Sequence, residues 1–155
     1  MDWFDAVVLA RTLMNENGLA HVPFGASKAR RVAGTTHFTR KRNAFGDVTP
    51  WVVEKIEISR PYAECNTVEQ VRDTILHEIA HAIAGNEAEH GIEWKAVAQR
   101  LGANPEAKCG AGTIQPTGTY QATCSCGVTR NYYRRPTVRR YCRVCSEVLQ
   151  PVRVR

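Results

Sequence analysis

The sequence lacks a hydrophobic run long enough to cross a membrane, because no apolar stretch approaches the ~20 residues that a transmembrane helix needs. Its first residues, MDWFDAVVLARTLMNENGL, lack the basic segment that begins a secretory signal peptide. No internal repeat occurs at the periods of solenoid proteins. The hydrophobic fraction of 43% and the charged fraction of 23% are typical of a soluble globular protein. We therefore expect a cytoplasmic or nucleoid-associated protein.

Acidic residues are nearly absent from the C-terminal end of the chain. Residues 124–155 contain eight arginines and one acidic residue, Glu147, so this segment carries a net charge of +7. The preceding 123 residues carry 13 basic and 14 acidic side chains, a net charge of −1. This asymmetry suggests a polyanionic partner for the C-terminal end, and a solvated basic tail is the alternative.

The chain has six cysteines, four of which form two close pairs near the C-terminus. Cys142 and Cys145 have the spacing of a zinc knuckle, whereas the pair Cys124 and Cys126 is one residue shorter than usual. The 15 residues between the pairs allow a hairpin to bring them together. Clustered cysteines without a signal peptide favour a structural zinc site of four thiolates. A disulfide pair or unligated thiols are the alternatives.

The N-terminal part reads as a helix followed by short strands. Apolar residues over 3–17 recur at near-helical spacing, and Gly18 ends that helix. Three stretches rich in strand-forming residues then predict a small antiparallel meander. They are residues 20–24, 30–40 and 51–59. Pro61 begins a predicted loop.

Two further helices follow. Thr67 predicts an N-cap, and Gln70 completes a capping box with it. The helix runs to Gly85, and a second helix begins near Gly91 and ends at Gly102. Residues 103–123 are rich in proline, glycine and threonine and predict a linker or an irregular segment.

The first of these two helices contains the motif H-E-x-x-H, from His77 to His81. Residues four apart lie one turn apart on the same face of a helix, so both imidazoles can bind one Zn²⁺ ion. Glu78 lies beside them, where a general base would take a proton from the attacking water and return it to the leaving amine. A surface helix with solvated histidines is the alternative.

His90 opens the second helix and can supply a third ligand, which leaves the fourth position open as in catalytic zinc sites. Eight residues separate His81 from His90, so the metzincin spacing is not met. Nearby side chains of less certain role are the helix-end glutamates and two cysteines considered as fourth ligands. They are Glu87, Glu89, Glu93, Cys65 and Cys109.

The stretches RDTILHEIAHAIAG (72–85) and HGIEWKAVAQRLG (90–102) resemble the SprT-like metalloproteases, whose relatives include the Spartan-type DNA–protein crosslink proteases. That family pairs H-E-x-x-H with a downstream H-G-x-x-[FW] that carries the third ligand. The resemblance implies that His90 is that ligand and that Trp94 fills the aromatic position. It also implies a C-terminal zinc ribbon, often with a short first cysteine pair.

The C-terminal segment interleaves arginines with tyrosines, a combination that suits phosphates and unpaired bases with little sequence preference. The candidate nucleic-acid contacts are Arg130, Arg134, Arg135, Arg139, Arg140, Arg143, Tyr132 and Tyr133. Arginines that only solvate the segment and tyrosines that pack on it are the alternative.

Together these patterns predict an α+β fold with three parts. A small zincin-like metalloprotease domain spans 1–106, a linker spans 107–123, and a basic zinc ribbon spans 124–155. The expected function is zinc-dependent cleavage of DNA-associated proteins, with one catalytic and one structural zinc. The alternatives are cleavage of a specific partner such as a repressor without DNA, and a non-catalytic DNA-binding zinc protein. The candidate oxyanion stabilisers are Arg60, Tyr62 and Tyr120.

Overall fold

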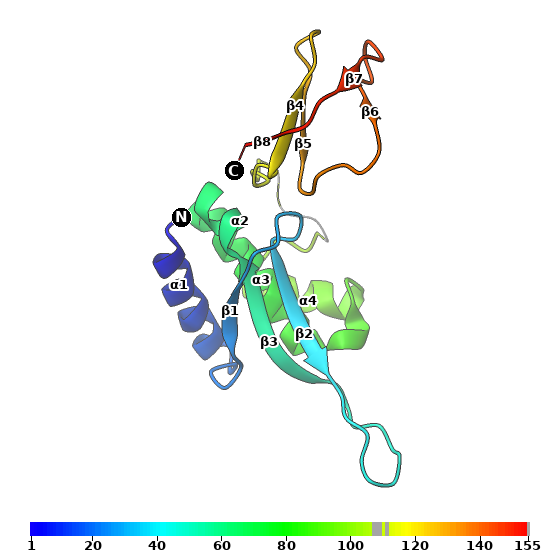
Figure 1. The fold of residues 1–155 in the computed structure, drawn as a ribbon. Coiled ribbons are helices and arrows are strands. Elements are labelled where there is room, and N and C mark those ends of the chain that lie inside the picture. Colours follow the sequence, from blue (N-terminus) through cyan, green and yellow to red (C-terminus); the bar gives the residue numbers. More distant parts are fainter. Residues whose placement is uncertain (107–109, 111, 155) are drawn as a thin grey trace. The chain divides into compact units, whose positions relative to one another are not determined.

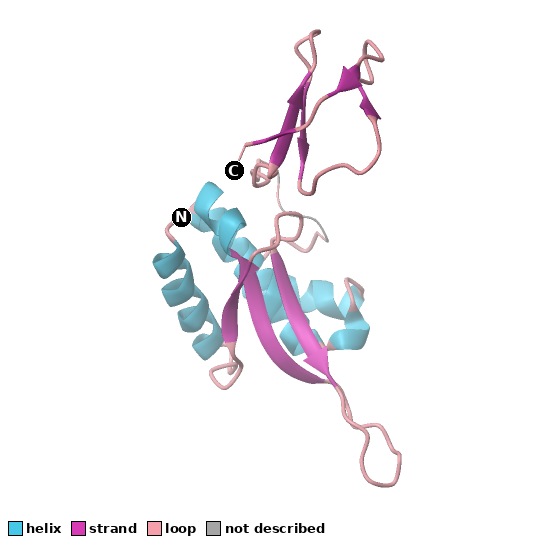
Figure 2. Ribbon diagram, viewed as in Figure 1, coloured by secondary structure: helices cyan, strands magenta, loops and turns pink. Residues whose placement is uncertain are grey.

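The computed structural model describes residues 1–106, 110 and 112–154, which form two units, Met1–Gln115 and Pro116–Arg155. Figure 2 shows helices and strands in the first unit, and only strands and loops in the second. The first unit contains α1 (Trp3–Glu16), β1 (Phe24–Ser27), β2 (Gly34–Thr39), β3 (Val52–Ser59), α2 (Arg60–Cys65), α3 (Val68–Ala84), η1 (Asn86–Ala88) and α4 (Ile92–Leu101). No helix in these described ranges is long and apolar enough to span a membrane.

The sheet of the first unit is mixed, with the strand order β1-β3-β2 (Figure 1). Strand β2 pairs antiparallel with β3, from Gly34 opposite Ile58 to Thr39 opposite Val52. Strand β1 pairs parallel with β3, so the predicted antiparallel meander is wrong for this strand. The physical reason lies in β3, whose Ile56 and Ile58 are fully buried, since the most apolar strand takes the central position.

The core forms where α1, α3 and the inward face of β3 meet. Ile56 and Ile58 pack in one apolar cluster with residues of the two helices, among them Met14 of α1 and Ile75 and Ile79 of α3. Between the two isoleucines, Glu57 points to the other face of the sheet, where its side chain is 21% exposed. This alternation anchors α3, the helix with the H-E-x-x-H motif, against the sheet.

The predicted capping box of α3 is confirmed. The Thr67 side chain accepts a hydrogen bond from the backbone N–H of Gln70, and the Gln70 side chain accepts one from the backbone N–H of Thr67. The helix ends before Gly85, whose φ of 91° lies in the region that favours glycine. After the short η1, α4 runs to Leu101 and ends at Gly102 in the left-handed conformation.

The predicted loop at Pro61 is instead the helix α2. Ser59 caps it by accepting a hydrogen bond from the backbone N–H of Tyr62, and Pro61 occupies its first turn. Proline is well tolerated there, because the first N–H groups of a helix have no partner within the helix. Pro61 therefore lies at the beginning of a helix and does not prevent one from forming.

The second unit contains β4 (Tyr120–Thr123), β5 (Thr129–Tyr132), β6 (Arg140–Tyr141), β7 (Val148–Leu149) and β8 (Val152–Arg153). They form a three-stranded sheet in the order β5-β4-β8 and a separate β6-β7 pair. Strand β4 lies within the segment 107–123, which its composition predicts to be irregular. The strand is only four residues long, and Ala122 is its one buried residue, so the sequence carries little alternation. The small core consists of Ala122, Cys124, Cys142 and Leu149.

Candidate metal centres

Three histidines converge at one point of the first unit. His77 and His81 lie one turn apart on α3, and His90 lies just before α4. The Nε2 atom of His90 is 3.1 Å from Nε2 of His81 and 3.1 Å from Nε2 of His77. All three side chains are half-buried, and their ligand atoms lie within 4.8 Å of one another.

This arrangement fits a metal ion better than it fits hydrogen bonding. A neutral imidazole nitrogen carries either one proton or one lone pair, so Nε2 of His90 cannot satisfy both neighbours. A tetrahedral Zn²⁺ ion with Zn–N bonds of about 2.0–2.1 Å separates its nitrogen ligands by about 3.4 Å, close to the distances found. Burial, and secondarily neighbouring histidines, lower the pKa of His77 and of His81 to about 4. Both are therefore neutral near pH 7, as metal ligation requires.

Trp94 of α4 supports the three imidazoles. Its side chain is fully buried, and its ring centroid lies 4.6 Å from those of His77 and His90 and 5.2 Å from that of His81. Its indole N–H has no hydrogen-bond partner among the described residues. The indole therefore acts on the cluster through packing, and it couples the position of α4 to that of α3.

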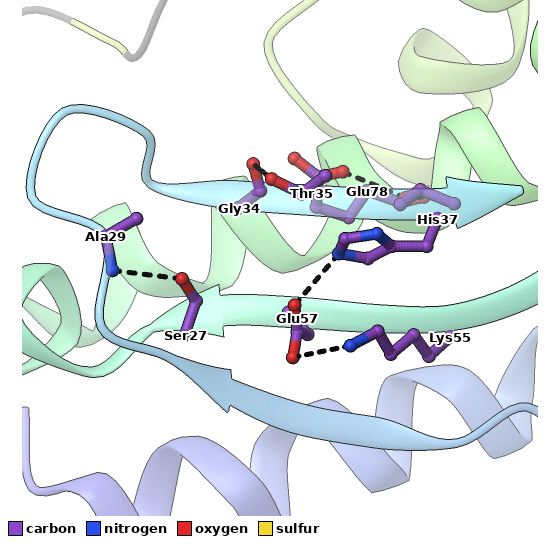
Figure 3. A network of polar contacts seen from close by, with 9 residues as sticks. Ser27, Ala29, Gly34, Thr35, His37, Lys55, Glu57 and Glu78 are labelled. Atoms are coloured by element: carbon purple, nitrogen blue, oxygen red, sulfur yellow. Dashed lines mark hydrogen bonds and ion pairs between the residues drawn. The ribbon is translucent and has the colours of Figure 1, made fainter.

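Glu78 is buried against β2, with only 5% of its surface exposed. The Thr36 hydroxyl lies 2.8 Å from Oε2 of Glu78 and 2.8 Å from its backbone carbonyl oxygen, and it can donate to either. At Gly34 a Cβ atom would lie 2.7 Å from both Cγ and Oε1 of Glu78, which real contacts do not allow. In Figure 3, Glu78 lies at β2 beside Gly34 and Thr35, whereas His37 points toward Glu57 of β3.

The environment of Glu78 suits proton transfer near neutral pH. Burial raises the pKa of its carboxyl group to about 7, and hydrogen bonds from the side chain and backbone of Thr36 act in the opposite direction. By contrast, Glu57 on the other face of the sheet has a lowered pKa, chiefly because Lys55 donates a hydrogen bond to it at 3.0 Å. Of these two glutamates, only Glu78 has a pKa that is shifted toward neutral pH.

The histidines and Glu78 open into a cavity of about 800 Å³. One side is formed by residues of β2 and the segment before it, and the other by α3 and the η1 region. Lining residues include Arg31, Thr36, Phe38, Asp73, Thr74, Asn86, Glu89, Thr113 and Gln115. Asn86 also lines a second cavity, of about 570 Å³, so the two adjoin there.

The candidate oxyanion stabilisers of the first unit, Arg60 and Tyr62, do not line the cavity at the histidines. Tyr62 is fully buried and its hydroxyl accepts a hydrogen bond from Thr74, Arg60 contacts Glu64 at 2.7 Å, and Tyr120 belongs to the second unit. The structure therefore does not support Arg60 or Tyr62 in this role. The residues that the sequence did not indicate are Gly34 and Thr36, since nothing in a six-residue strand marks them as neighbours of Glu78.

The helix-end glutamates and Cys65 do not belong to the histidine cluster. Glu87, Glu89 and Glu93 are exposed, in keeping with solvated charge at helix ends. The Cys65 thiol lies 3.3 Å from the carbonyl oxygen of Ile114, outside the histidine cluster. Cys109 lies outside the described residues.

Four cysteines of the second unit form the other cluster. The Sγ atoms of Cys124 and Cys145 are 3.3 Å apart and those of Cys126 and Cys142 are 3.6 Å apart. All four thiols are free, and their sulfurs lie within 4.8 Å of one another. Zn–S bonds of about 2.3 Å would separate the sulfurs by about 3.8 Å, so the cluster fits a closed structural zinc site.

Backbone N–H groups favour thiolates in this cluster, and at Cys142 they prevail. Backbone N–H groups of Cys145 and Val144 lower the pKa of Cys142 to about 6. At Cys124 and Cys126 they act in the same direction, but hydrogen bonds with neighbouring side chains and burial outweigh them and raise the pKa. The backbone turns tightly at each pair, with positive φ at Gly127 and Ser146. The thiolate form is the one that binds zinc.

The candidate nucleic-acid contacts of the second unit differ in exposure. Arg134, Arg135, Arg139, Arg140 and Arg143 are exposed. Arg130 is half-buried, and Tyr132 packs partly against the small core beside Val128. Tyr133 is also half-buried, whereas Tyr141, on β6, is 55% exposed. The exposed arginines are thus available to a polyanion, and Tyr132 contributes at least in part to the fold.

The comparisons with known proteins identify one family. The family model that matches the chain is that of the SprT-like family, over residues 6–117. This range contains all three histidines and ends before the first of the four clustered cysteines. No curated protein and no solved structure matches the chain.

The two clusters predict a zinc content of about two ions per chain. We expect His81→Ala to retain about one ion and Cys142→Ser to retain about one, because each removes a ligand of a different site. Elemental analysis by mass spectrometry of the purified variants measures this. His21→Ala and Cys65→Ser, which lie outside both clusters, serve as controls and should keep both ions. Equal zinc content in His81→Ala and His21→Ala would contradict the histidine site.

The buried carboxyl group predicts an effect of pH on the metal-free protein. A raised folded-state pKa contributes stability below pH 4.5 that is lost as the pH rises through about 7. Glu78→Gln should therefore raise the free energy of unfolding at pH 8, by up to about 3 kcal/mol, and have little effect at pH 5. Urea denaturation with EDTA measures this through tryptophan fluorescence, since Trp3, Trp51 and Trp94 all lie in the first unit. Exposed Glu93→Gln is the control, and a pH-independent effect of Glu78→Gln would contradict the prediction.

Proposed function

The chain belongs to the SprT-like family, and from this premise we propose that it is a zinc-dependent endopeptidase that hydrolyses DNA-associated proteins. Family membership indicates a zinc-dependent protease-like domain. The observation that carries the proposal is the convergence of three histidine Nε2 atoms beside a buried glutamate, at the wall of an 800 Å³ cavity. Three protein ligands leave a metal ion an open coordination position, as in catalytic rather than structural zinc sites.

The reaction divides between the metal and the carboxyl group of Glu78. A Zn²⁺ ion held by His77, His81 and His90 would polarise the scissile carbonyl and make the attacking water more acidic. Glu78 takes the proton of that water and later delivers it to the leaving amine, a double role suited to a carboxyl group whose pKa lies near 7. When it donates to the carboxylate rather than to the backbone carbonyl oxygen, the Thr36 hydroxyl group holds Oε2 of Glu78 in place.

The edge of the sheet suggests how a polypeptide binds. Strand β2 is the last strand of the β1-β3-β2 sheet, and its residues Gly34–Thr36 and Phe38 line the cavity. An extended peptide can pair with such an edge through main-chain hydrogen bonds, which require no particular side chains. Asn86 lines both this cavity and the second one, so a bound polypeptide can extend from the histidines toward η1.

The association with DNA is supported by charge. The segment 124–155 carries +7, and six of its described arginines are exposed. Exposed arginines pair with phosphates independently of base sequence. The second unit would therefore hold the enzyme on DNA, and the zinc bound by four cysteines would stabilise it.

The decisive experiment is cleavage of a DNA-binding protein by the zinc-loaded chain, with and without single-stranded DNA. We expect cleavage that DNA accelerates. Glu78→Gln should reduce it by at least about 100-fold while zinc content and DNA affinity stay unchanged, because only the proton-transfer group is lost.

A charge variant separates the outcomes. Replacing Arg134, Arg135, Arg139 and Arg140 together by glutamine should weaken DNA binding and remove the acceleration, while basal cleavage persists. Cleavage that never depends on DNA would indicate a specific protein partner instead. DNA binding by a chain that cleaves neither itself nor DNA-bound proteins would indicate a non-catalytic zinc protein.

The hydroxyl group of Thr36 gives a second, finer test. Thr36→Val should lower kcat about tenfold with little change in KM, because the hydrogen bond to the Glu78 carboxylate is lost. Thr36→Ser keeps the hydroxyl and should restore most of the activity, and zinc content should be the same in both variants. Steady-state kinetics on a fluorogenic peptide measure this, and equal activity of the two variants would contradict the role of the hydroxyl.

A further inference from the structure

The charged side chains of the first unit are unevenly distributed along the chain, although its net charge is close to zero. Between Glu16 and Asp47 the chain has no acidic residue and six lysines and arginines. They stand in two groups that flank β2. Before the strand are Lys28, Arg30 and Arg31, and directly after it are Arg40, Lys41 and Arg42.

The second group belongs to a loop, residues 40–50, that projects beyond the ends of β2 and β3 (Figure 1). We call it the projecting loop. Its two arms are paired, since Arg42 bridges to Val48 and the backbone N–H of Thr49 donates to the carbonyl oxygen of Lys41 at 2.8 Å. All residues of the loop are exposed, and the Arg42 guanidinium group also donates a hydrogen bond to the carbonyl oxygen of Gly46 at 3.4 Å.

The tip of the projecting loop is ordered by Asn43. Its side-chain oxygen accepts hydrogen bonds from the backbone N–H groups of Phe45 and Asp47, each at 2.9 Å. Its amide group donates to the Asp47 carboxylate at 3.0 Å, so the only acidic group of the loop is already engaged. The tip thus has a defined shape, and little conformational entropy remains to be lost when it binds.

Phe45 stands at this tip with 92% of its surface exposed, the highest exposure of any large hydrophobic residue described. A single exposed hydrophobic side chain is ordinary. Here it is held on an ordered turn that has no core to fill, three positions after Arg42, the last of three consecutive cationic residues. At the base of the loop, the Arg40 guanidinium group stacks on Trp51, 4.4 Å from the ring centroid.

We propose that the projecting loop is a second nucleic-acid contact, in which Phe45 stacks on an unpaired base and Arg40, Lys41 and Arg42 pair with the flanking phosphates. Aromatic faces and cations in alternation are the chemistry by which proteins hold single strands. A duplex hides the faces of its bases, so the loop prefers single-stranded or locally opened DNA. The inference rests on the proposed action on DNA-associated proteins and adds a contact within the protease unit itself.

The contact has a consequence for the enzyme. Strand β2 lines the cavity and leads directly into the projecting loop, and Arg40 at the loop's base also lines the second cavity. DNA held on the loop therefore lies at the end of the same strand that borders the cavity. An opened DNA strand beside an attached protein would then be bound by the unit that cleaves that protein.

The test measures binding of the full zinc-loaded chain to a fluorescein-labelled 20-residue oligothymidine, by fluorescence anisotropy in a Glu78→Gln background that prevents self-cleavage. Phe45→Ala should weaken binding about tenfold, since stacking on one base contributes about 1–3 kcal/mol. Phe45→Trp should retain the affinity. Phe4→Ala is the matched control, because Phe4 is 72% exposed on α1, and it should have no effect.

Salt dependence and competition complete the test. Changing Arg40, Lys41 and Arg42 together to glutamine should reduce the slope of log Kd against log salt by about 2, as expected for three phosphate contacts on a single strand. The Phe45→Ala loss should be smaller on a matched duplex. Equal affinities of Phe45→Ala and Phe4→Ala for the oligonucleotide overturn the proposal. The proposal is also overturned if Phe45→Ala weakens binding to duplex DNA or to polyglutamate as much as to the oligonucleotide. Such a result would indicate a surface that binds polyanions in general.

These outcomes separate the loop from the proposed function. If Phe45→Ala binds normally while the four-arginine variant does not, the loop proposal fails and DNA-dependent proteolysis stands. If Phe45→Ala loses affinity but the unmodified chain cleaves no protein, the loop stands and the peptidase proposal fails. Absence of all DNA binding by the unmodified chain overturns both DNA contacts.

Discussion

The close approach of β2 to α3 at Gly34 is the constraint on which the candidate catalytic site depends. A Cβ atom at this position would lie 2.7 Å from the Glu78 side chain and 2.9 Å from Cδ1 of Ile58. Glycine therefore lets the strand and the helix pack at a distance that larger residues forbid. Because side chains alternate along a strand, Thr36 then lies on the same face as Gly34 and reaches Glu78 with its hydroxyl group. The close approach of β2 to α3 therefore both buries Glu78 and positions its carboxyl group.

The ligand cluster depends on a second contact, between Trp94 and the three imidazoles. Two histidines on α3 share a face because they are four residues apart, but His90 arrives from another element. The fully buried indole of Trp94 touches all three rings and so ties α4 to α3 at the required separation. The packing of Trp94 thus holds the three imidazoles in position, which favours a site that is formed before the metal binds.

Local signals could be read directly from the sequence. The capping box at Thr67 and Gln70 and the left-handed end at Gly102 involve residues within one helical turn, so short-range chemistry determines them. The pairing of β1 with β3 was not predictable in this way, because a strand's partner depends on which strand is central. Helix α2 was missed because Pro61 is compatible with both a loop and the first turn of a helix. The net charge of residues 1–123 is close to zero, and this sum did not reveal the two groups of cationic residues before and after β2.

The sequence by itself determined the family and the types of side chain available for chemistry, since the ligand motif and the cysteine spacings are local patterns. The sequence also predicted His90 as the third ligand, and the tertiary structure brings its ring to the two helix histidines. Only the tertiary structure decided that Gly34 and Thr36 border Glu78, and that Phe45 faces solvent. These relations join residues from 9 to 44 positions apart, or concern exposure, and depend on how a mixed sheet packs against α3. Spacing along the chain encodes which groups share a helix face, whereas packing sets which groups meet across elements.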